Sequence, residues 1–180
     1  MVTLSENEES LLRELFTEKQ NRKNDFFLQE GKVCREIGFI NAGLAKYFIN
    51  KNGEELIYDF ASEGNFICNY ESFLDRSSSL KNIQFIEDTS WLSLSYDNLQ
   101  VFYQKIQQGE KFGRLVCEQI FVDALRKITS LYTDTPEERY QQFVALYPSL
   151  QQRVPQYFIS SFLGVKPQSL SRIRRRLALL

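Results

Sequence analysis

The chain of 180 residues contains no histidine. This absence excludes Ser-His-Asp and Cys-His nucleophile pairs, histidine-ligated zinc and non-haem iron, and haem held by a proximal histidine. The sequence also lacks a phosphate-binding glycine loop of the usual spacing, and no pair of carboxylates stands out among the Asp and Glu residues. We therefore expect no enzymatic activity, no metal site and no cofactor.

Cysteine is scarce, and a membrane-spanning segment is missing. Cys34, Cys68 and Cys117 are widely spaced and odd in number, which suits a reducing compartment and shows no metal-ligand pattern. We expect each of them to be a small buried hydrophobic side chain. No apolar run approaches the roughly eighteen residues of a membrane helix, and the N-terminus does not resemble a signal peptide. The sequence thus predicts a cytoplasmic protein with no membrane partner.

Acidic residues are absent from the end of the chain. From Arg139 to Leu180 there are seven basic residues and no acidic one, although the whole chain has a net charge of only −1. Residues 1–138 consequently carry a net charge of about −8, so the small net charge of the whole chain is the sum of an acidic part and a basic part. Electrostatic screening in physiological salt acts over about 8 Å, and DNA would therefore respond to the local positive field. We expect the C-terminal region to bind double-stranded DNA.

Two short helices joined by a tight turn at Gly164 are predicted within this basic region. Pro155 and Pro167 suit the first position of each helix, because proline has the required φ and no N–H group to leave unpaired. This pattern is typical of a helix-turn-helix, whose second helix enters the DNA major groove.

The second of these helices has two opposite faces at about 100° per residue. Its apolar face, formed by Leu170, Ile173 and Leu177, is expected to pack on Phe158, Ile159 and Phe162 of the first helix. The opposite face carries Gln and Arg side chains, which can bond to the edges of adenine and guanine. Ser169 at the helix N-terminus and Arg176, about 80° from this polar face, suit phosphate contacts. The predicted DNA-binding residues are Lys166, Gln168, Ser169, Ser171, Arg172, Arg175 and Arg176.

A simpler interpretation of Arg174, Arg175 and Arg176 is a solvated helix end, favourable because cations suit the C-terminal dipole. That interpretation does not explain why acidic residues are missing over the whole C-terminal region.

The first hundred residues are rich in short β-segments. Ser5 and Glu8 form a capping-box pattern that opens a short helix, and Asn52-Gly53 is a strong hairpin signal. Strands are expected at Asp25–Leu28, Val33–Ile40, Leu44–Ile49, Glu54–Phe60, Ile83–Glu87 and Ser90–Ser95. Many short strands at this spacing favour a small barrel or roll over a parallel sheet.

A longer helix is predicted from about Gly109 to Tyr132. Its apolar residues cover too wide an arc for one amphipathic stripe, so the helix needs burial on two sides. One side can lie on the roll and the other on a second copy of the chain; the alternative is a central helix in the core of a monomer. For the dimer, we expect Phe112, Leu115, Gln119 and Val122 near the axis.

Roll, long helix and helix-turn-helix occur in the order found in the Crp/Fnr family of bacterial transcription regulators, which this sequence resembles over nearly its whole length. The similarity is closest to the compact branch seen in Bacteroidetes-type bacteria. It is carried by Glu30-Gly-Lys-Val-Cys34, Ile37-Gly-Phe-Ile40, Gly43-Leu-Ala-Lys-Tyr47, Glu71-Ser-Phe-Leu74, Glu137-Glu-Arg-Tyr140, Tyr147-Pro148 and Ser169-Leu-Ser-Arg-Ile173. The resemblance implies a homodimer on a two-fold symmetric operator, with Gln168, Ser171 and Arg172 at base-reading positions and Ser169 at a phosphate.

The sequence departs from cyclic AMP-binding relatives in the short cassette that holds the nucleotide. A Gly-Glu pair and a later Arg-Ser pair are replaced by Cys68, Asn69, Ser79 and Leu80. A buried phosphate without a cation or amide partner is costly, and Arg76 or Lys81 could substitute only if the loop were remodelled. We therefore expect no cyclic AMP binding and leave the effector open, between a small molecule, a protein and none.

Two further departures concern features of other relatives. The sequence ends soon after the second helix, so we expect no β-hairpin wing. It also lacks the grouped N-terminal cysteines that hold an iron–sulfur cluster in oxygen-sensing relatives.

The expected fold is α+β: an N-terminal double-stranded β-helix, or jelly roll, of the cyclic-nucleotide-binding type, a long dimerisation helix and an all-α helix-turn-helix domain. The expected domains are residues 1–108, 109–133 and 134–180. The predicted function is a homodimeric, sequence-specific transcription regulator, with RNA polymerase as a further candidate partner. An alternative is a sensory or protein-interaction module with a vestigial helix-turn-helix. A cupin-like enzyme, the third possibility, would need a cavity lined by converging carboxylates.

Overall fold

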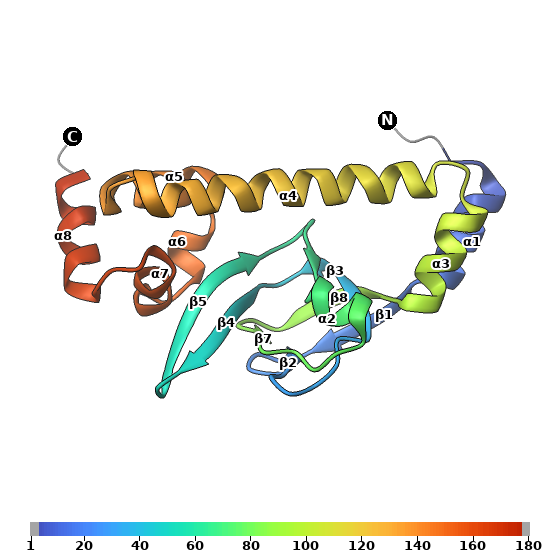
Figure 1. Cartoon of the computed structure of the whole chain (residues 1–180), viewed down its shortest axis with the longest axis horizontal. Helices are drawn as coiled ribbons and strands as arrows, with labels where there is room; N and C mark the ends of the chain where they lie inside the picture. The colour runs from blue at the N-terminus through green and yellow to red at the C-terminus, as the bar shows by residue number, and fades with distance from the viewer. Residues whose placement is uncertain (1–3, 178–180) are drawn as a thin grey trace. The chain divides into compact units, whose positions relative to one another are not determined.

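The computed structural model, which describes residues 4–177, is an α+β protein with two compact units (Figure 1). The first unit comprises residues Met1–Ile49 and Asp59–Ile120, and the second comprises Asn50–Tyr58 and Phe121–Leu180.

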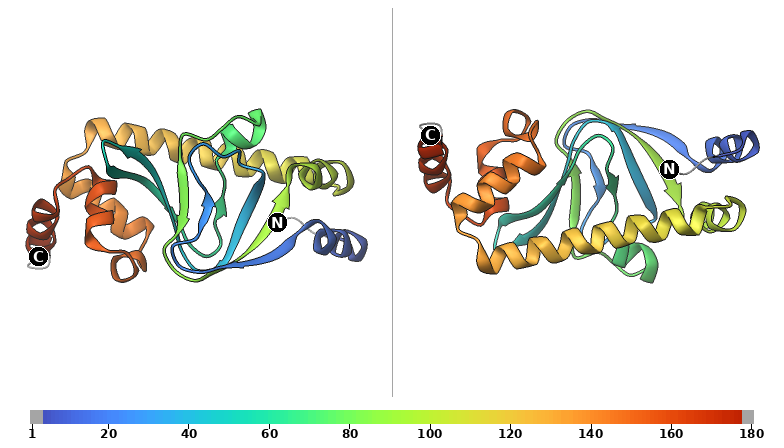
Figure 2. Two further views of the ribbon diagram at one scale, coloured as in Figure 1. Left: turned by 90° about the horizontal axis from the view of Figure 1, so that it is seen from below. Right: turned by 90° about the horizontal axis from the view of Figure 1, so that it is seen from above.

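The β-roll consists of two four-stranded sheets with the orders β1-β8-β3-β6 and β2-β7-β4-β5. The strands are β1 (Thr17–Asn21), β2 (Phe26–Leu28), β3 (Glu36–Ala42), β4 (Ala45–Lys51), β5 (Glu54–Ala61), β6 (Phe66–Ile67), β7 (Asn82–Phe85) and β8 (Thr89–Ser95). Pairings of β8 with β1 and β3, and of β7 with β2 and β4, are antiparallel. Sequential neighbours therefore often lie in different sheets, as expected for a roll (Figure 2).

Aliphatic and aromatic side chains from both sheets fill the core of the roll, with Ile40, Ile67, Ile83 and Phe85 fully buried. Gly38 in β3 permits this packing, because a Cβ atom there would lie only 2.6 Å from Cγ1 of Ile67. Helix α1 (Glu6–Leu15) packs beside α3 (Tyr96–Lys105), and the short α2 (Tyr70–Asp75) follows β6. The first half of α4 (Gly109–Thr133) completes this unit.

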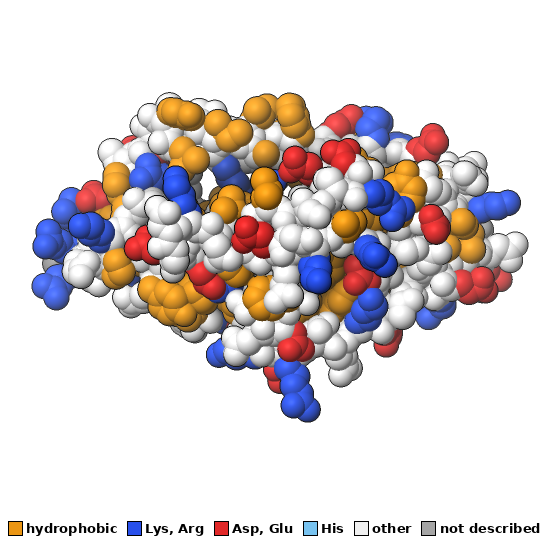
Figure 3. Space-filling model, turned by 60° about the horizontal axis from the view of Figure 1, so that its bottom comes forward, with side chains coloured by type: hydrophobic (Ala, Val, Ile, Leu, Met, Phe, Trp, Pro, Cys, Tyr) orange, Lys and Arg blue, Asp and Glu red, His pale blue; other side chains and the backbone are white. Residues whose placement is uncertain are grey.

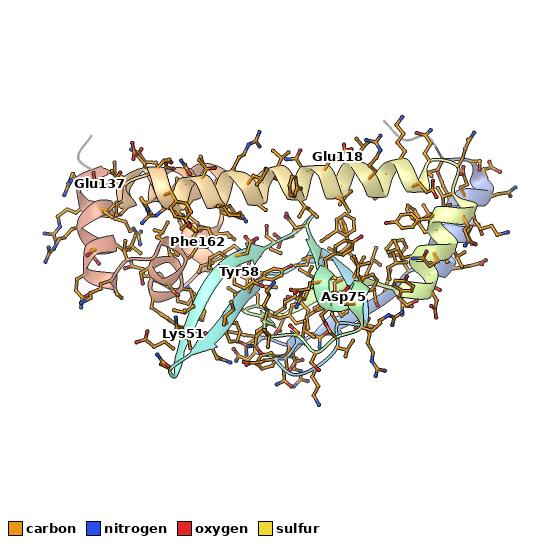
Figure 4. The ribbon with its side chains drawn as sticks, in the orientation of Figure 1. Lys51, Tyr58, Asp75, Glu118, Glu137 and Phe162 are labelled. Carbon is orange, nitrogen blue, oxygen red and sulfur yellow. The ribbon has the colours of Figure 1, made fainter. Side chains whose placement is uncertain are left out.

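The second unit contains the rest of α4 and four shorter helices, α5 (Pro136–Leu146), α6 (Leu150–Arg153), α7 (Gln156–Leu163) and α8 (Pro167–Leu177). Its core is formed by apolar side chains from α5 to α8, with Phe143, Leu150, Leu163 and Leu170 almost completely buried. The ring of Phe162, labelled in Figure 4, packs against the rings of Phe143 and Tyr147.

Most of the predicted elements are confirmed. Ser5 and Glu8 form the expected capping box of α1, and Asn52 and Gly53 both have positive φ in the β4–β5 hairpin. Helix α4 begins at Gly109 and ends one residue beyond the predicted Tyr132. Among residues 4–177, no helix is both long and apolar enough to span a membrane.

Several boundaries and elements differ from the predictions. Strand β3 begins at Glu36 rather than Val33, because Val33 forms an isolated bridge to Ser78. Pro155 caps α7 from the preceding position instead of occupying its first turn. The sequence did not predict β1, β6, α2, α3, α5 or α6 as separate elements. Strand β1 is polar, and β6, α2 and α6 are very short, so these four lack a clear hydrophobic period.

Candidate nucleic-acid interface

Helices α7 and α8 are joined by a tight turn that depends on Gly164. Gly164 adopts the left-handed conformation with φ 67°, and the N–H of Val165 donates to the Ser160 carbonyl at 3.0 Å, as in a helix C-cap. Pro167 then begins α8, as predicted. These local features produce the helix-turn-helix.

Arg139 in α5 holds the end of α7, a role that was not predicted from the sequence. Its guanidinium donates to the Leu163 carbonyl from Nε at 3.2 Å and from Nη2 at 3.1 Å, and to the Asp134 carbonyl at 2.7 Å. Carbonyls at a helix C-terminus carry partial negative charge and attract a cation. One of the seven C-terminal basic residues therefore fixes the first helix of the motif in place.

The two predicted faces of α8 are present. Leu170 and Ile173 are buried against the rest of the unit and Leu177 is half-buried, whereas Gln168, Ser171, Arg172 and Arg175 are exposed. The Ser171 hydroxyl donates to the Pro167 carbonyl of its own helix at 3.1 Å. In the described part of the chain, no side-chain hydrogen bond or ion pair engages Gln168, Arg172 or Arg175. The polar face can thus turn its donors outward.

Basic side chains gather around α8, at the left of the space-filling view (Figure 3). Between α8 and the start of α5 lies an open groove of about 450 Å³. It brings together four of the predicted DNA-binding residues, Lys166, Ser169, Arg172 and Arg176, and is also lined by Thr135, Pro136, Glu137, Val165 and Ile173. Lys166, Arg176 and the Ser169 hydroxyl suit phosphate oxygens, whereas Arg172 lines the groove and also belongs to the polar face of α8.

One acidic residue enters this groove. Glu137, labelled in Figure 4, lies in the first turn of α5, and its carboxylate accepts a hydrogen bond from the Arg176 guanidinium in an ion pair. Glu137 lies two residues before Arg139, where the region without acidic residues begins. Arg176, expected to be available to a phosphate, has an internal partner in this structure.

The start of α5 is fixed by a second capping box. The Thr135 hydroxyl accepts from the N–H of Glu138 at 3.3 Å, and the Glu138 carboxylate accepts from the N–H of Thr135 at 2.7 Å. The bond from the Thr135 backbone, followed by that from its hydroxyl, lowers the pKa of Glu138. Both boxes of this type in the protein follow the Ser/Thr-x-x-Glu pattern.

Helix α4 carries many exposed apolar side chains. Among its 25 residues only Gly109 is buried, and the predicted dimer residues Phe112, Leu115, Gln119 and Val122 are all exposed. Phe112 is also in edge-to-face contact with Phe66 and Phe102 of the roll. More apolar side chains continue along the second half of the helix, at Ile120, Phe121, Leu125, Ile128 and Leu131.

Two of the four cassette positions, Asn69 and Ser79, take part in an internal hydrogen-bond network. Asn69 Nδ2 donates to Ser79 Oγ at 2.7 Å, and Ser79 Oγ donates to the Lys81 carbonyl at 2.7 Å. Both residues are buried, whereas Leu80 is 75% exposed. The polar groups at these positions therefore satisfy one another.

The two cations near the cassette are also engaged. The Arg76 guanidinium lies 4.4 Å from the centre of the Tyr96 ring, and Lys81 Nζ lies 3.4 Å from a carboxylate oxygen of Glu71. Neither is held ready for a buried phosphate.

The prediction that all three cysteines are buried is wrong for Cys117, which is exposed on α4. Cys34 is buried, and Cys68 is half-buried. Although 34 residues apart in sequence, Cys34 and Cys68 are neighbours, with Sγ atoms 3.7 Å apart. No cluster of three or more Cys, Asp or Glu side chains suitable for a metal ion is found over the described range.

Residues 18–106 match the family described as the cyclic nucleotide-binding domain. No curated protein sequence matches the chain. Solved structures resemble it over nearly the full length. FixK2 from Bradyrhizobium japonicum has a TM-score of 0.78 and 17% identity, and the similarity covers 91% of this chain and 85% of FixK2.

Two further structures have the same architecture. A protein assigned to the Crp/Fnr family of transcriptional regulators from Eubacterium rectale has a TM-score of 0.72 and 12% identity, with 98% of this chain and 84% of that chain covered. The c-di-GMP responsive global regulator CLP from Xanthomonas campestris has a TM-score of 0.71 and 12% identity, with 97% and 92% covered.

Proposed function

We propose that this chain, which contains a cyclic nucleotide-binding domain and has the fold of Crp/Fnr-type transcription regulators, is a sequence-specific DNA-binding regulator. The observation that carries the proposal is the division of α8 into two faces. Leu170 and Ile173 attach the helix to its unit, and Gln168, Arg172 and Arg175 project from the opposite face. A helix presented in this way can enter the major groove and bond to base edges.

The contacts divide into base recognition and backbone positioning. Arg172 and Gln168 lie on the outer face, where a bidentate contact to guanine and a contact to adenine are possible. Lys166, Ser169 and Arg176 line the groove beside α5, and in our proposal they bind phosphates. Arg176 must then exchange Glu137 for a phosphate oxygen.

The regulator acts as a homodimer that forms along α4. Exposed apolar side chains along a 25-residue helix support this proposal. A second copy that covers the exposed Phe and Leu side chains would remove apolar surface from water, which lowers the free energy of the dimer. A two-fold dimer would place one α8 helix in each half-site, with half-sites about one helical turn of DNA apart. Binding of RNA polymerase in the cytoplasm is a further part of the proposal.

The roll is a sensor domain that does not bind cyclic AMP. Support comes from the Asn69–Ser79 bond and from the engagement of Arg76 and Lys81. Its input is then a different ligand, a protein or a covalent change. The protein acts through binding and not through catalysis.

Selection of genomic DNA fragments by the purified full chain tests the regulator proposal. We expect enrichment of a two-fold symmetric site, with affinity that falls steeply as salt rises because phosphate contacts release counterions. Recovery of random fragments with weak affinity would support instead an interaction module with a vestigial helix-turn-helix.

A further inference from the structure

Cys34 and Cys68 form a thiol pair inside the roll. Cys34 is only 2% exposed, and Cys68 is half-buried, with the two Sγ atoms 3.7 Å apart. The residues lie in irregular segments: Cys34 between the bridge at Val33 and strand β3, and Cys68 between β6 and α2. Neither cysteine lies inside a strand or a helix.

Hydrogen bonds hold the two backbones so that the thiols face each other. The N–H of Cys34 donates to Ser72 Oγ at 2.9 Å, and the N–H of Cys68 donates to the Tyr47 hydroxyl at 3.3 Å. These partners come from α2 and β4, far from the cysteines in sequence. The tertiary fold therefore maintains the proximity of the sulfur atoms.

The surroundings also favour ionisation of one member. A hydrogen bond from the Cys68 thiol, opposed by burial and assisted by hydrogen bonds with the backbones of Asn69 and Glu36, lowers the pKa of Cys34 to about 7. The thiolate is the reactive form of cysteine. The pKa of Cys68 is shifted in the opposite direction, because its hydrogen bond to Cys34 and its burial both raise it.

We propose that Cys34 and Cys68 are a modification site for hydroperoxides, at which two-electron oxidation forms a reversible intramolecular disulfide. To form the bond, the sulfur atoms would have to approach from 3.7 Å to about 2.0 Å. Cys117 is not a member of the pair; its sulfur lies 3.9 Å from the Tyr70 hydroxyl.

The reaction balances in two steps. The Cys34 thiolate attacks the terminal oxygen of the hydroperoxide, so an S–O bond forms, the O–O bond breaks, and the released alkoxide or hydroxide takes a proton. Cys68 sulfur then attacks Cys34 Sγ; the S–S bond forms, the S–O bond breaks, and the hydroxide leaves as water with the Cys68 proton. Two thiols and one hydroperoxide give a disulfide, one alcohol or water, and one water.

The bond would join the start of β3 to the segment that leads into α2. Asn69, next to Cys68, is part of the hydrogen-bond network at the cassette positions. Oxidation would therefore act directly on the part of the roll where relatives hold a nucleotide. This inference concerns the roll alone and does not depend on DNA binding.

The test uses the full chain with Cys117→Ser, which removes the exposed thiol and leaves both paired cysteines intact. The protein is treated with hydrogen peroxide, unfolded, and alkylated with N-ethylmaleimide before intact mass spectrometry. We expect two alkylated thiols before treatment and none after it, with a product lighter by two hydrogen atoms. Dithiothreitol should restore both thiols, and the oxidised protein should remain monomeric on a non-reducing denaturing gel.

Cys68→Ser in the same background is the matched control. It should gain oxygen atoms at Cys34 or form a cross-linked dimer, and it should not lose two hydrogens. Circular dichroism checks that this variant folds, but the main result comes from the protein that retains both cysteines. Two thiols still alkylated after an hour in millimolar peroxide would overturn the proposal. So would oxidation of one cysteine to a sulfinic acid, or disulfides only between chains.

Discussion

Arg176 in α8 and Glu137 in the first turn of α5 form an ion pair across the groove that we propose binds phosphate. The pair links the last turn of the proposed recognition helix to a neighbouring helix. It also places a negative charge among Lys166, Arg172 and Arg176. Bound DNA would have to displace this carboxylate or tolerate it.

Glu137→Gln should therefore strengthen DNA binding. Removing the carboxylate releases Arg176 for a phosphate and removes a repulsion, and exposed ion pairs of this kind correspond to a gain of roughly two- to fivefold. The gain should be similar for specific and random DNA, as measured by fluorescence anisotropy. Glu71→Gln, which removes the carboxylate of an exposed pair with Lys81 in the roll, is the matched control and should leave affinity unchanged. Weaker binding by Glu137→Gln would contradict the phosphate role of this groove.

Arg172→Ala and Arg176→Ala should differ in kind. Loss of a bidentate base contact at Arg172 should cost about 1 to 3 kcal/mol on the selected site and relax specificity at one base pair per half-site. Loss of a phosphate contact at Arg176 should weaken all sequences alike and reduce the salt slope by about one per contact. Binding titrations on specific and random duplexes at several salt concentrations make the comparison. Identical effects of the two variants on specific and random DNA would show that α8 binds DNA only through its positive charge and does not read the sequence.

Val122→Glu should weaken association along α4. A carboxylate placed at a covered apolar position must lose its water, so we expect the dimer to dissociate at least about tenfold more readily. Ala124→Glu adds the same charge about 200° around the helix, away from the proposed axis, and should have little effect. Sedimentation equilibrium at micromolar concentration measures both. A wild-type chain that stays monomeric there would refute the dimer.

Cyclic AMP and cyclic GMP should not bind the roll. Asn69 and Ser79 are already bonded to each other, Arg76 stacks on Tyr96, and Lys81 pairs with Glu71, so a phosphate would have to displace these contacts. Calorimetry at millimolar nucleotide should show no heat of binding, and the thermal unfolding midpoint should not move. Micromolar affinity for either nucleotide would show that the internal network opens to a ligand.

The capping box of α5 should make part of the stability depend on pH. The folded protein lowers the pKa of Glu138 through bonds from Thr135, so the ionised form is favoured in the folded state. Its stabilising contribution is present above the ordinary glutamate pKa and is lost as pH falls through the lowered folded value. The thermal midpoint of Glu138→Gln should thus be lower than that of the wild type at pH 7, and the difference should shrink in acid. Glu71→Gln should not show this pattern, and a difference that grows in acid would contradict it.

Short-range patterns determined much of this protein from the sequence alone. The Ser-x-x-Glu box of α1, the Asn52-Gly53 turn and the turn at Gly164 were predicted, and each depends on residues within a few positions of one another. The Thr-x-x-Glu box of α5 was not predicted, although it is equally local. The two faces of α8 likewise follow from a helical period of 3.6 residues, which is already present in the order of Leu170, Arg172 and Ile173. Such features can be predicted from the sequence because the local backbone conformation sets their geometry.

The tertiary structure alone decided which distant side chains meet. Nothing in the spacing of Cys34 and Cys68, of Asn69 and Ser79, or of Glu137 and Arg176 predicts their contact. Strand β1 is polar along its length and forms because its backbone pairs with β8 at the edge of a sheet. These features depend on chain segments that are brought together by burial of the core. The hydrophobic effect that drives this burial is non-directional, so the sequence does not specify which distant residues will become neighbours.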